Sequence, residues 1–355
     1  MSRFSPAPVL LALLALAGCN TPPPAPPQEA PQQGTPAQTV TAPPQASPAA
    51  ESLKALVAQQ DRLDRIAAPL LLKNAELCRS QARNLLGFTA KNRYSYSSEF
   101  VQAAQEVYGL HDQLQIMSVL GGSGAALAGI KRGDVLLKIE GRELPQGMNA
   151  ERIAATILAP LVTGKTRVNL TIQRDGETLQ VQAPLTRACG MRVELGNADN
   201  VATYGDGARV MVTRGMLAFT RSDEEVAYLI AREMAHNALG HPGRIRGNSA
   251  ITAMIDNLLQ IKPDTSLLIT NGGIKPYPAD LDAQADYLAI FLLVRAGYPI
   301  GNARFFWSRL AEAHPATRIP DHTALHPNLA ARLSALDKAA GDVRTKQAQK
   351  KPLTP

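Results

Sequence analysis

The sequence predicts an α+β protein with two folded regions, and three observations support this. From about residue 105 to residue 187, short apolar strands alternate with glycine turns and one helix, as expected for a β-rich module. From about residue 190 to residue 340, a strand pair precedes amphipathic helices, which predicts a mostly helical domain with a small sheet. With 355 residues and 45% hydrophobic residues, the chain can bury two cores.

The first 18 residues have the features of an export signal. Arg3 precedes a short apolar run, Val9–Ala17, which is too short to span a bilayer as a helix. The following Leu-Ala-Gly-Cys sequence ends at Cys19 and resembles the lipobox of bacterial lipoproteins. The resemblance implies lipidation of Cys19, and Asn20 favours an outer-membrane lipoprotein facing the periplasm. The alternative is an ordinary secretory signal followed by a chance cysteine.

Residues 19–50 are rich in Pro, Gln and Ala and predict an extended tether, whereas residues 341–355 form a basic tail. The net charge of +7 fits an ordinary solvated basic surface better than attraction to an anionic membrane. The sequence contains no nucleic-acid-binding motif, so nucleic acid is not an expected partner. The lipid anchor is the expected membrane contact.

Residues 51–100 are expected to be a helical segment that packs on the later domain. Leu53, Leu56 and Val57 begin an apolar stripe of helical spacing that continues to about Leu86. Apart from Cys19, the cysteines are Cys78 and Cys189. In the oxidising periplasm we expect them to form a disulfide that encloses the middle module, the alternative being two unpaired buried cysteines.

The β-rich module has the motif order of a known domain family. Small residues, Ala-Gly-Ile, Gly-Asp, a strand and a glycine follow one another in Ser123–Gly141, and a hairpin is expected around Asp175-Gly176. This stretch resembles a PDZ domain. The resemblance implies binding of C-terminal or unfolded segments of envelope proteins by strand addition, with a carboxylate loop near Gly109 and Leu110. The alternative is a module that serves only as a spacer.

A helix is expected from Asp223 to about Leu239. Ser222 and Glu225 form a capping box at its start, and the helix carries Arg232-Glu-Met-Ala-His236. Zinc peptidases of the zincin type carry His-Glu-x-x-His on such a helix: the two histidines bind one ion and the glutamate activates the bound water. Glu233 and His236 fit this pattern, but the position of the first histidine holds Arg232.

Other motifs occur in the same order as in a known peptidase family. They are Asn197-Ala198, the strand Val210–Thr213 followed by Arg-Gly, the motif helix, Asp282-x-x-x-Asp286, and His326-Pro with Arg332. This order resembles the zinc metallopeptidases of the HtpX and CaaX prenyl protease family, with a PDZ domain inserted. The resemblance implies a zincin-like fold, zinc as cofactor and Glu233 as general base. It further places a third zinc ligand at Asp282 and supporting or substrate-contacting residues at Asp286, His326 and Arg332.

The departures from the family pattern concern the metal. Arginine has no free electron pair to donate and stays protonated, so Arg232 cannot replace a histidine ligand. We therefore expect an Arg232–Asp282 salt bridge where relatives hold zinc. His241 is expected to be a helix-end or surface residue, and Trp307 is expected to pack in the core with Phe305 and Phe306.

These features support three hypotheses of function. The first is an envelope lipoprotein that is impaired in zinc hydrolysis and binds envelope polypeptides through its cleft and its PDZ-like module. The second is an active metalloendopeptidase in envelope quality control, with a substitute ligand such as His241 or His326. The third is a structural lipoprotein without peptide chemistry.

Overall fold

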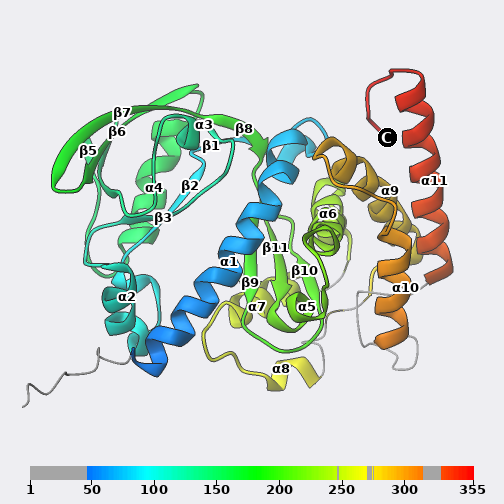
Figure 1. Ribbon diagram of the computed structural model, residues 1–355, viewed down its shortest axis with the longest axis horizontal. Coiled ribbons are helices and arrows are strands. Elements are labelled where there is room, and N and C mark those ends of the chain that lie inside the picture. Colours follow the sequence, from blue (N-terminus) through cyan, green and yellow to red (C-terminus); the bar gives the residue numbers. More distant parts are fainter. Residues whose placement is uncertain (1–45, 246–247, 270–273, 275, 315–328) are drawn as a thin grey trace, which may run out of the picture. The chain divides into compact units, whose positions relative to one another are not determined.

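The structure is a computed structural model that describes residues 46–245, 248–269, 274, 276–314 and 329–355. Within these ranges, no helix combines the length and the apolar character needed to cross a membrane. The described chain contains a β-rich module and a mostly helical domain, and helix α1 (Pro48–Lys73) contacts both (Figure 1).

Helix α1 begins where the Ser47 side chain accepts a hydrogen bond from the Ala50 backbone N–H. Its later residues, including Leu63 and Leu70, are buried in the core of the helical domain. Its first turns belong to a smaller core that includes Leu53. The expected helical segment that packs on the later domain is confirmed as far as Lys73, but the expectation of helix to about residue 86, and of a helical segment to residue 100, was wrong. The helix ends at Lys73, and short strands follow that form only by pairing with distant segments.

The module is built on a sheet of order β2-β3-β4-β6-β7, with β5 paired to β4. Its elements are β2 (Phe88–Lys91), α2 (Val101–Tyr108), β3 (Gln115–Val119), α3 (Gly124–Leu127), β4 (Val135–Ile139), β5 (Arg142–Glu143), α4 (Ala150–Val162), β6 (Arg167–Arg174) and β7 (Glu177–Pro184). The expected hairpin is present, since β6 pairs antiparallel with β7. Asp175 and Gly176 at its turn both have positive φ, as such a tight turn requires. The sheet begins with β2, so the expected module boundary at residue 105 was too late.

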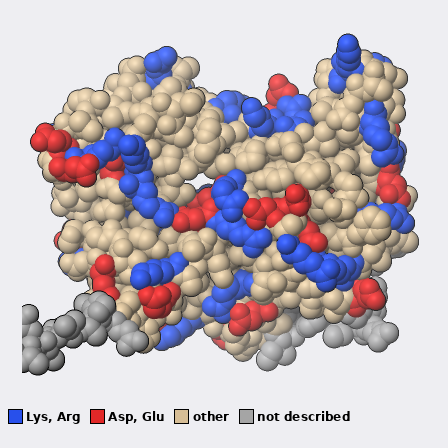
Figure 2. All heavy atoms as spheres, in the orientation of Figure 1, with Lys and Arg blue, Asp and Glu red and all other residues tan. Residues whose placement is uncertain are grey.

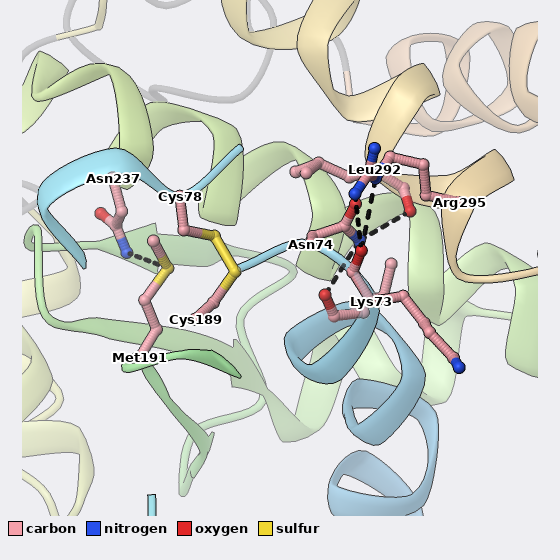
Figure 3. The surroundings of a disulfide bond; sticks show 9 residues. Lys73, Asn74, Cys78, Cys189, Met191, Asn237, Leu292 and Arg295 are labelled. Atoms are coloured by element: carbon pink, nitrogen blue, oxygen red, sulfur yellow. Dashed lines mark hydrogen bonds between the residues drawn. A yellow bond between two sulfur atoms is a disulfide. The ribbon is translucent and has the colours of Figure 1, made fainter. Parts of the chain in front are cut away.

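A two-stranded ribbon connects the module to the helical domain. Strand β1 (Ala82–Leu85) pairs antiparallel with β8 (Thr186–Cys189). Cys78 and Cys189 are joined by a disulfide at the base of this ribbon, beside Met191 and Asn237 (Figure 3). In the same view Asn74, just after α1, donates to the carbonyl oxygen of Leu292 at 2.9 Å. The chain therefore leaves and re-enters the helical domain at one covalently fixed point.

The helical domain contains a three-stranded sheet of order β10-β11-β9, in which β9 and β11 are parallel and β10 is antiparallel. Its strands are β9 (Arg192–Gly196), β10 (Thr203–Gly205) and β11 (Arg209–Thr213). Its helices are α5 (Arg214–Phe219), α6 (Asp223–Leu239), α7 (Asn248–Leu258), α8 (Ser266–Ile269), α9 (Ala279–Arg295), α10 (Ala303–Ala313) and α11 (Leu329–Ala348). Short 3-10 turns lie at Arg79–Gln81, Arg93–Ser95, Ser98–Phe100 and His241–Arg244.

Helix α6 lies at the centre of this domain. Every residue from Val226 to Ala238 is buried, because α1, the sheet and α9 all pack against the helix. The expectation that residues 341–355 form a separate basic tail was wrong for the first half. Helix α11 runs through Ala348 and buries Val343 against the core.

Candidate metal centre

Helix α6 presents three side chains of the peptidase motif to the interior. Ser222 caps the helix by accepting from the Glu225 N–H at 3.3 Å, and Gly240 ends it with a φ of 71°. This frame fixes Arg232, Glu233 and His236, which are all almost fully buried. Buried charged groups require partners, so the neighbouring elements decide what this motif can do.

Those partners come from α9 and α11. Asp282 and Asp286 lie one turn apart on α9, and Arg332 lies on α11. Arg232 donates from Nη1 to Glu233 Oε1 at 2.7 Å and from Nη2 to Asp282 Oδ1, and its Nε lies 3.6 Å from Asp286 Oδ1. The expected Arg232–Asp282 salt bridge is therefore present, and the guanidinium lies among three carboxylates.

A second guanidinium completes the cluster. Arg332 donates from Nε to Asp286 Oδ2 at 2.8 Å and lies 3.8 Å from Asp282. Trp307 lies against both arginines, with its ring centroid 4.3 Å from the Arg332 guanidinium and 5.9 Å from that of Arg232. The expected core packing of Phe305 was wrong, because that side chain is 71% exposed, whereas Phe306 and Trp307 are buried.

Burial controls the electrostatics of the cluster. Burial raises the pKa of Glu233 and of Asp286, although the nearby guanidinium groups oppose this shift. Burial acts to lower the pKa of Arg232, but Asp282, Glu233 and Asp286 together raise it above its ordinary value. The pKa of His236 lies well below its usual value because of burial and the nearby Arg232 charge. The cluster thus contains a permanent cation and a neutral imidazole.

His241 lies at the end of α6, as one of the two expected alternatives, but it is not a surface residue. Gly240 reverses the chain after α6, so that His241 is buried with its Nδ1 3.0 Å from Nδ1 of His236. Tyr277 stacks on His236 with ring centroids 4.0 Å apart. Burial lowers the pKa of His241 to about 4. The sequence signal for this arrangement was the glycine between Leu239 and His241, since a left-handed residue folds the next side chain back onto the helix.

Thr203 is a site residue that the sequence patterns did not indicate. It lies on β10 and donates from Oγ1 to Glu233 Oε1 at 2.9 Å. The carboxylate of Glu233 is thus bonded to Thr203 and Arg232 together. In this arrangement the Glu233 carboxylate holds the Arg232 side chain in place. Its Oε1 atom already accepts two hydrogen bonds, which leaves no acceptor site there for a water molecule.

Two expected site residues, Cys19 and His326, lie outside the described residues. The expected carboxylate loop at Gly109 and Leu110 was wrong. The Gly109 N–H bonds to the carbonyl of Gln105 and the Leu110 N–H bonds to that of Ala104, so both amides serve as the C-cap of α2. The Leu110 side chain is fully buried. Neither of these two amides is available for a peptide carboxylate.

The donor set does not fit a zinc ion. Zinc in catalytic sites has three protein ligands with free electron pairs. His236 Nε2 lies 3.3 Å from Asp282 Oδ1, and both atoms could donate an electron pair to a metal ion. Arg232 offers no electron pair, and its positive charge repels a cation. Among the described residues, no group of three or more His, Cys, Asp or Glu side chains is arranged to hold a metal ion.

Comparison with known proteins gives a family match for the region that contains α6 and α9. Residues 194–340 match the model of peptidase family M48. This region resembles a zinc metallopeptidase domain and includes the whole Arg232 cluster. The mitochondrial metalloendopeptidase OMA1 of Schizosaccharomyces pombe is 22% identical over 148 residues, which are 40% of this chain and 44% of that protein. The chain thus matches less than half the length of this curated relative.

A likeness to a solved structure is weaker. The crystal structure of the HtrA3 PDZ domain bound to a phage-derived ligand matches 31% of this chain and 92% of that domain. The identity is 16% and the TM-score is 0.24, which is too low to assign the module to a family.

Proposed function

We propose that this chain is an M48-like envelope lipoprotein that binds polypeptides and is impaired in zinc hydrolysis. One observation supports this proposal above all others: the guanidinium of Arg232 is bonded to the carboxylates of Glu233 and Asp282. These are the groups that, by family resemblance, would activate water and bind the metal. The Arg232 guanidinium, a cation that belongs to the chain, thus takes the place of the zinc ion that relatives bind.

The cluster would resist metal entry for an energetic reason. A zinc ion would have to displace Arg232, and the buried guanidinium has no route to solvent without breaking its contacts with three carboxylates. Breaking a buried ion pair costs about 3–5 kcal/mol, and the displaced charge would repel the incoming ion. The arrangement stabilises the peptidase-like fold while opposing its ordinary chemistry.

Localisation and partners are part of the proposal. Lipidation at Cys19 would hold the chain at the outer membrane, facing the periplasm, where unfolded or C-terminal segments of envelope proteins would be its partners. The PDZ-like module would supply part of the binding surface through the terminal strand β2. The disulfide between Cys78 and Cys189 is consistent with an oxidising compartment.

A permanently unfolded polypeptide, such as a reduced and alkylated protein, tests the proposal. We expect the full chain in detergent to bind it without cleaving it, and zinc added in excess to leave it uncut. Chelator-sensitive cleavage by the wild-type chain would refute the proposed impairment. Absence of any binding would refute the proposed polypeptide-binding role.

A second candidate, an active metalloendopeptidase, is favoured by the position of His241. Its Nδ1 lies near that of His236, and both imidazoles are neutral because burial lowers their pKa. A metal held by these two histidines would leave Glu233 as the general base. In that case His241→Gln would abolish both metal binding and cleavage, whereas under the first proposal neither activity exists to be lost.

A further inference from the structure

A cavity of about 440 Å³ lies between the module and the helical domain. It is lined by Ala67 and Leu71 of α1, Phe88 and Thr89 of β2, and Met191 and Glu194 at the start of β9. Figure 1 shows β2 on the side of the module that faces α1, and Figure 2 shows the surface hollowed there. This cavity is separate from the Arg232 cluster, none of whose residues lines it.

Two strand edges reach this cavity, and they differ in their pairing. Strand β2 ends its sheet, so its outer backbone groups have no neighbouring strand. The outer edge of β9 is instead closed by Gln60, whose side-chain amide donates to the Val193 carbonyl and accepts from the Leu195 N–H, each at 2.8 Å. An extended segment entering the cavity can therefore add a strand only to β2.

Four carboxylates line the cavity, and they differ in their partners. Asp61 pairs with Arg132, and Glu151 lies 3.8 Å from Lys91. Asp64 accepts hydrogen bonds from Ser118 at 2.5 Å and Gln60 at 2.8 Å. Glu194 is only 26% exposed and lies 3.5 Å from Arg192, which is itself 70% exposed. Among the described residues, no donor makes a hydrogen bond to Glu194. Burial accordingly raises its pKa. A half-buried carboxylate of this kind gains most from a donor that a ligand brings.

We propose that this cavity binds an extended polypeptide segment that pairs with the edge of β2 and places an arginine or lysine side chain against Glu194. The inference rests on the proposed polypeptide-binding function and specifies the ligand: a β-forming segment with a basic residue. The apolar wall of Ala67, Leu71 and Met191 suits the aliphatic part of such a side chain.

Fluorescence anisotropy with the full chain in detergent tests this assignment. Two labelled unstructured peptides would differ at one position, which is arginine in one and glutamine in the other. We expect the arginine peptide to bind about tenfold more tightly, as for a charge-assisted contact. Glu194→Gln should abolish this preference. The control Glu143→Gln, at an exposed carboxylate on β5, should retain it.

A photoreactive group on the arginine peptide provides a readout that does not depend on the variant's folding. Mass spectrometry should locate the crosslinks on β2 and at the start of β9. Equal affinity of the two peptides for the wild-type chain, or crosslinks confined to α6 and α9, would overturn the inference while leaving polypeptide binding intact. Failure of both peptides and of an unfolded protein to bind would instead refute the proposed function itself.

Discussion

Replacing Arg232 with methionine removes the central cation and retains most of the side-chain volume. The structure indicates which carboxylates would then lose their partners. Glu233 keeps its bond from Thr203, and Asp286 keeps its bond from Arg332 at 2.8 Å. From the described part of the chain, Asp282 would retain the 3.8 Å approach of Arg332 and the 3.3 Å approach of His236. The cost is therefore that of about one buried carboxylate left unpaired.

Removing one partner of a buried ion pair costs about 3–5 kcal/mol of the free energy of unfolding. For a domain of this size, that corresponds to a fall in Tm of roughly 6–20 °C. Urea denaturation of Arg232→Met and the wild-type chain measures the difference directly. The double variant Arg232→Met/Asp282→Asn should recover part of the loss, because the amide removes the unpaired charge.

The loss should also depend on pH in a defined direction. Burial raises the pKa of Glu233 and of Asp286 while the Arg232 charge opposes this, so without Arg232 their folded-state pKa values lie further above those of the unfolded chain. Their destabilising effect is then largest at neutral pH and decreases as the pH falls toward the unfolded value of about 4. Arg65→Met is the control: Arg65 is 65% exposed, pairs with Asp223, and should cost less than about 1 kcal/mol. If Arg232→Met is no less stable than this control, the buried cation has no structural role.

Three further predictions concern the surroundings of the cluster and the connection to the module. Thr203→Val should lower the free energy of unfolding by about 1–3 kcal/mol in denaturant titrations, because Glu233 loses a buried donor; an unchanged midpoint would contradict the contact. Replacing Cys78 and Cys189 together with serine should destabilise the chain by about 4–5 kcal/mol, since the disulfide spans 111 residues, and a thermal melt insensitive to this change would argue against the bond. Wild-type stability should fall as the pH drops from about 6.5 toward 4, because His241 and His236 bind protons only in the unfolded chain over this range; His241→Gln should make that slope shallower in unfolding experiments, and an identical slope in both proteins would exclude His241 as a contributor.

The sequence predicted elements with local signals and missed those that depend on distant partners. The helix Asp223–Leu239 was predicted with its observed bounds, because Ser222 and Gly240 mark its ends. The hairpin at Asp175-Gly176 was predicted for the same kind of reason. Strands β1 and β2 have four residues each, and their pairing partners lie far along the chain, so no periodicity identified them.

In the candidate site too, some contacts were predicted from the sequence and others depended on how distant elements pack. The charge of Arg232, together with the family resemblance that places Asp282 at the position of the third zinc ligand, predicted their salt bridge. The burial of His241 depended on the turn at Gly240, and the contact of Thr203 with Glu233 depended on how β10 packs on α6. The mistaken peptide loop at Gly109 has a similar cause, because a Gly-Leu pair can equally be a helix C-cap.

Zinc titration calorimetry on the wild-type chain and on Arg232→His/Asp282→Glu tests the central claim most directly. We predict no tight binding to the wild-type chain and one site of high affinity in the double variant, which is lost again on His236→Ala. Stoichiometric, chelator-reversible zinc in the wild-type chain that depends on His236 would contradict it, because the guanidinium of Arg232 could then not occupy the position of the metal.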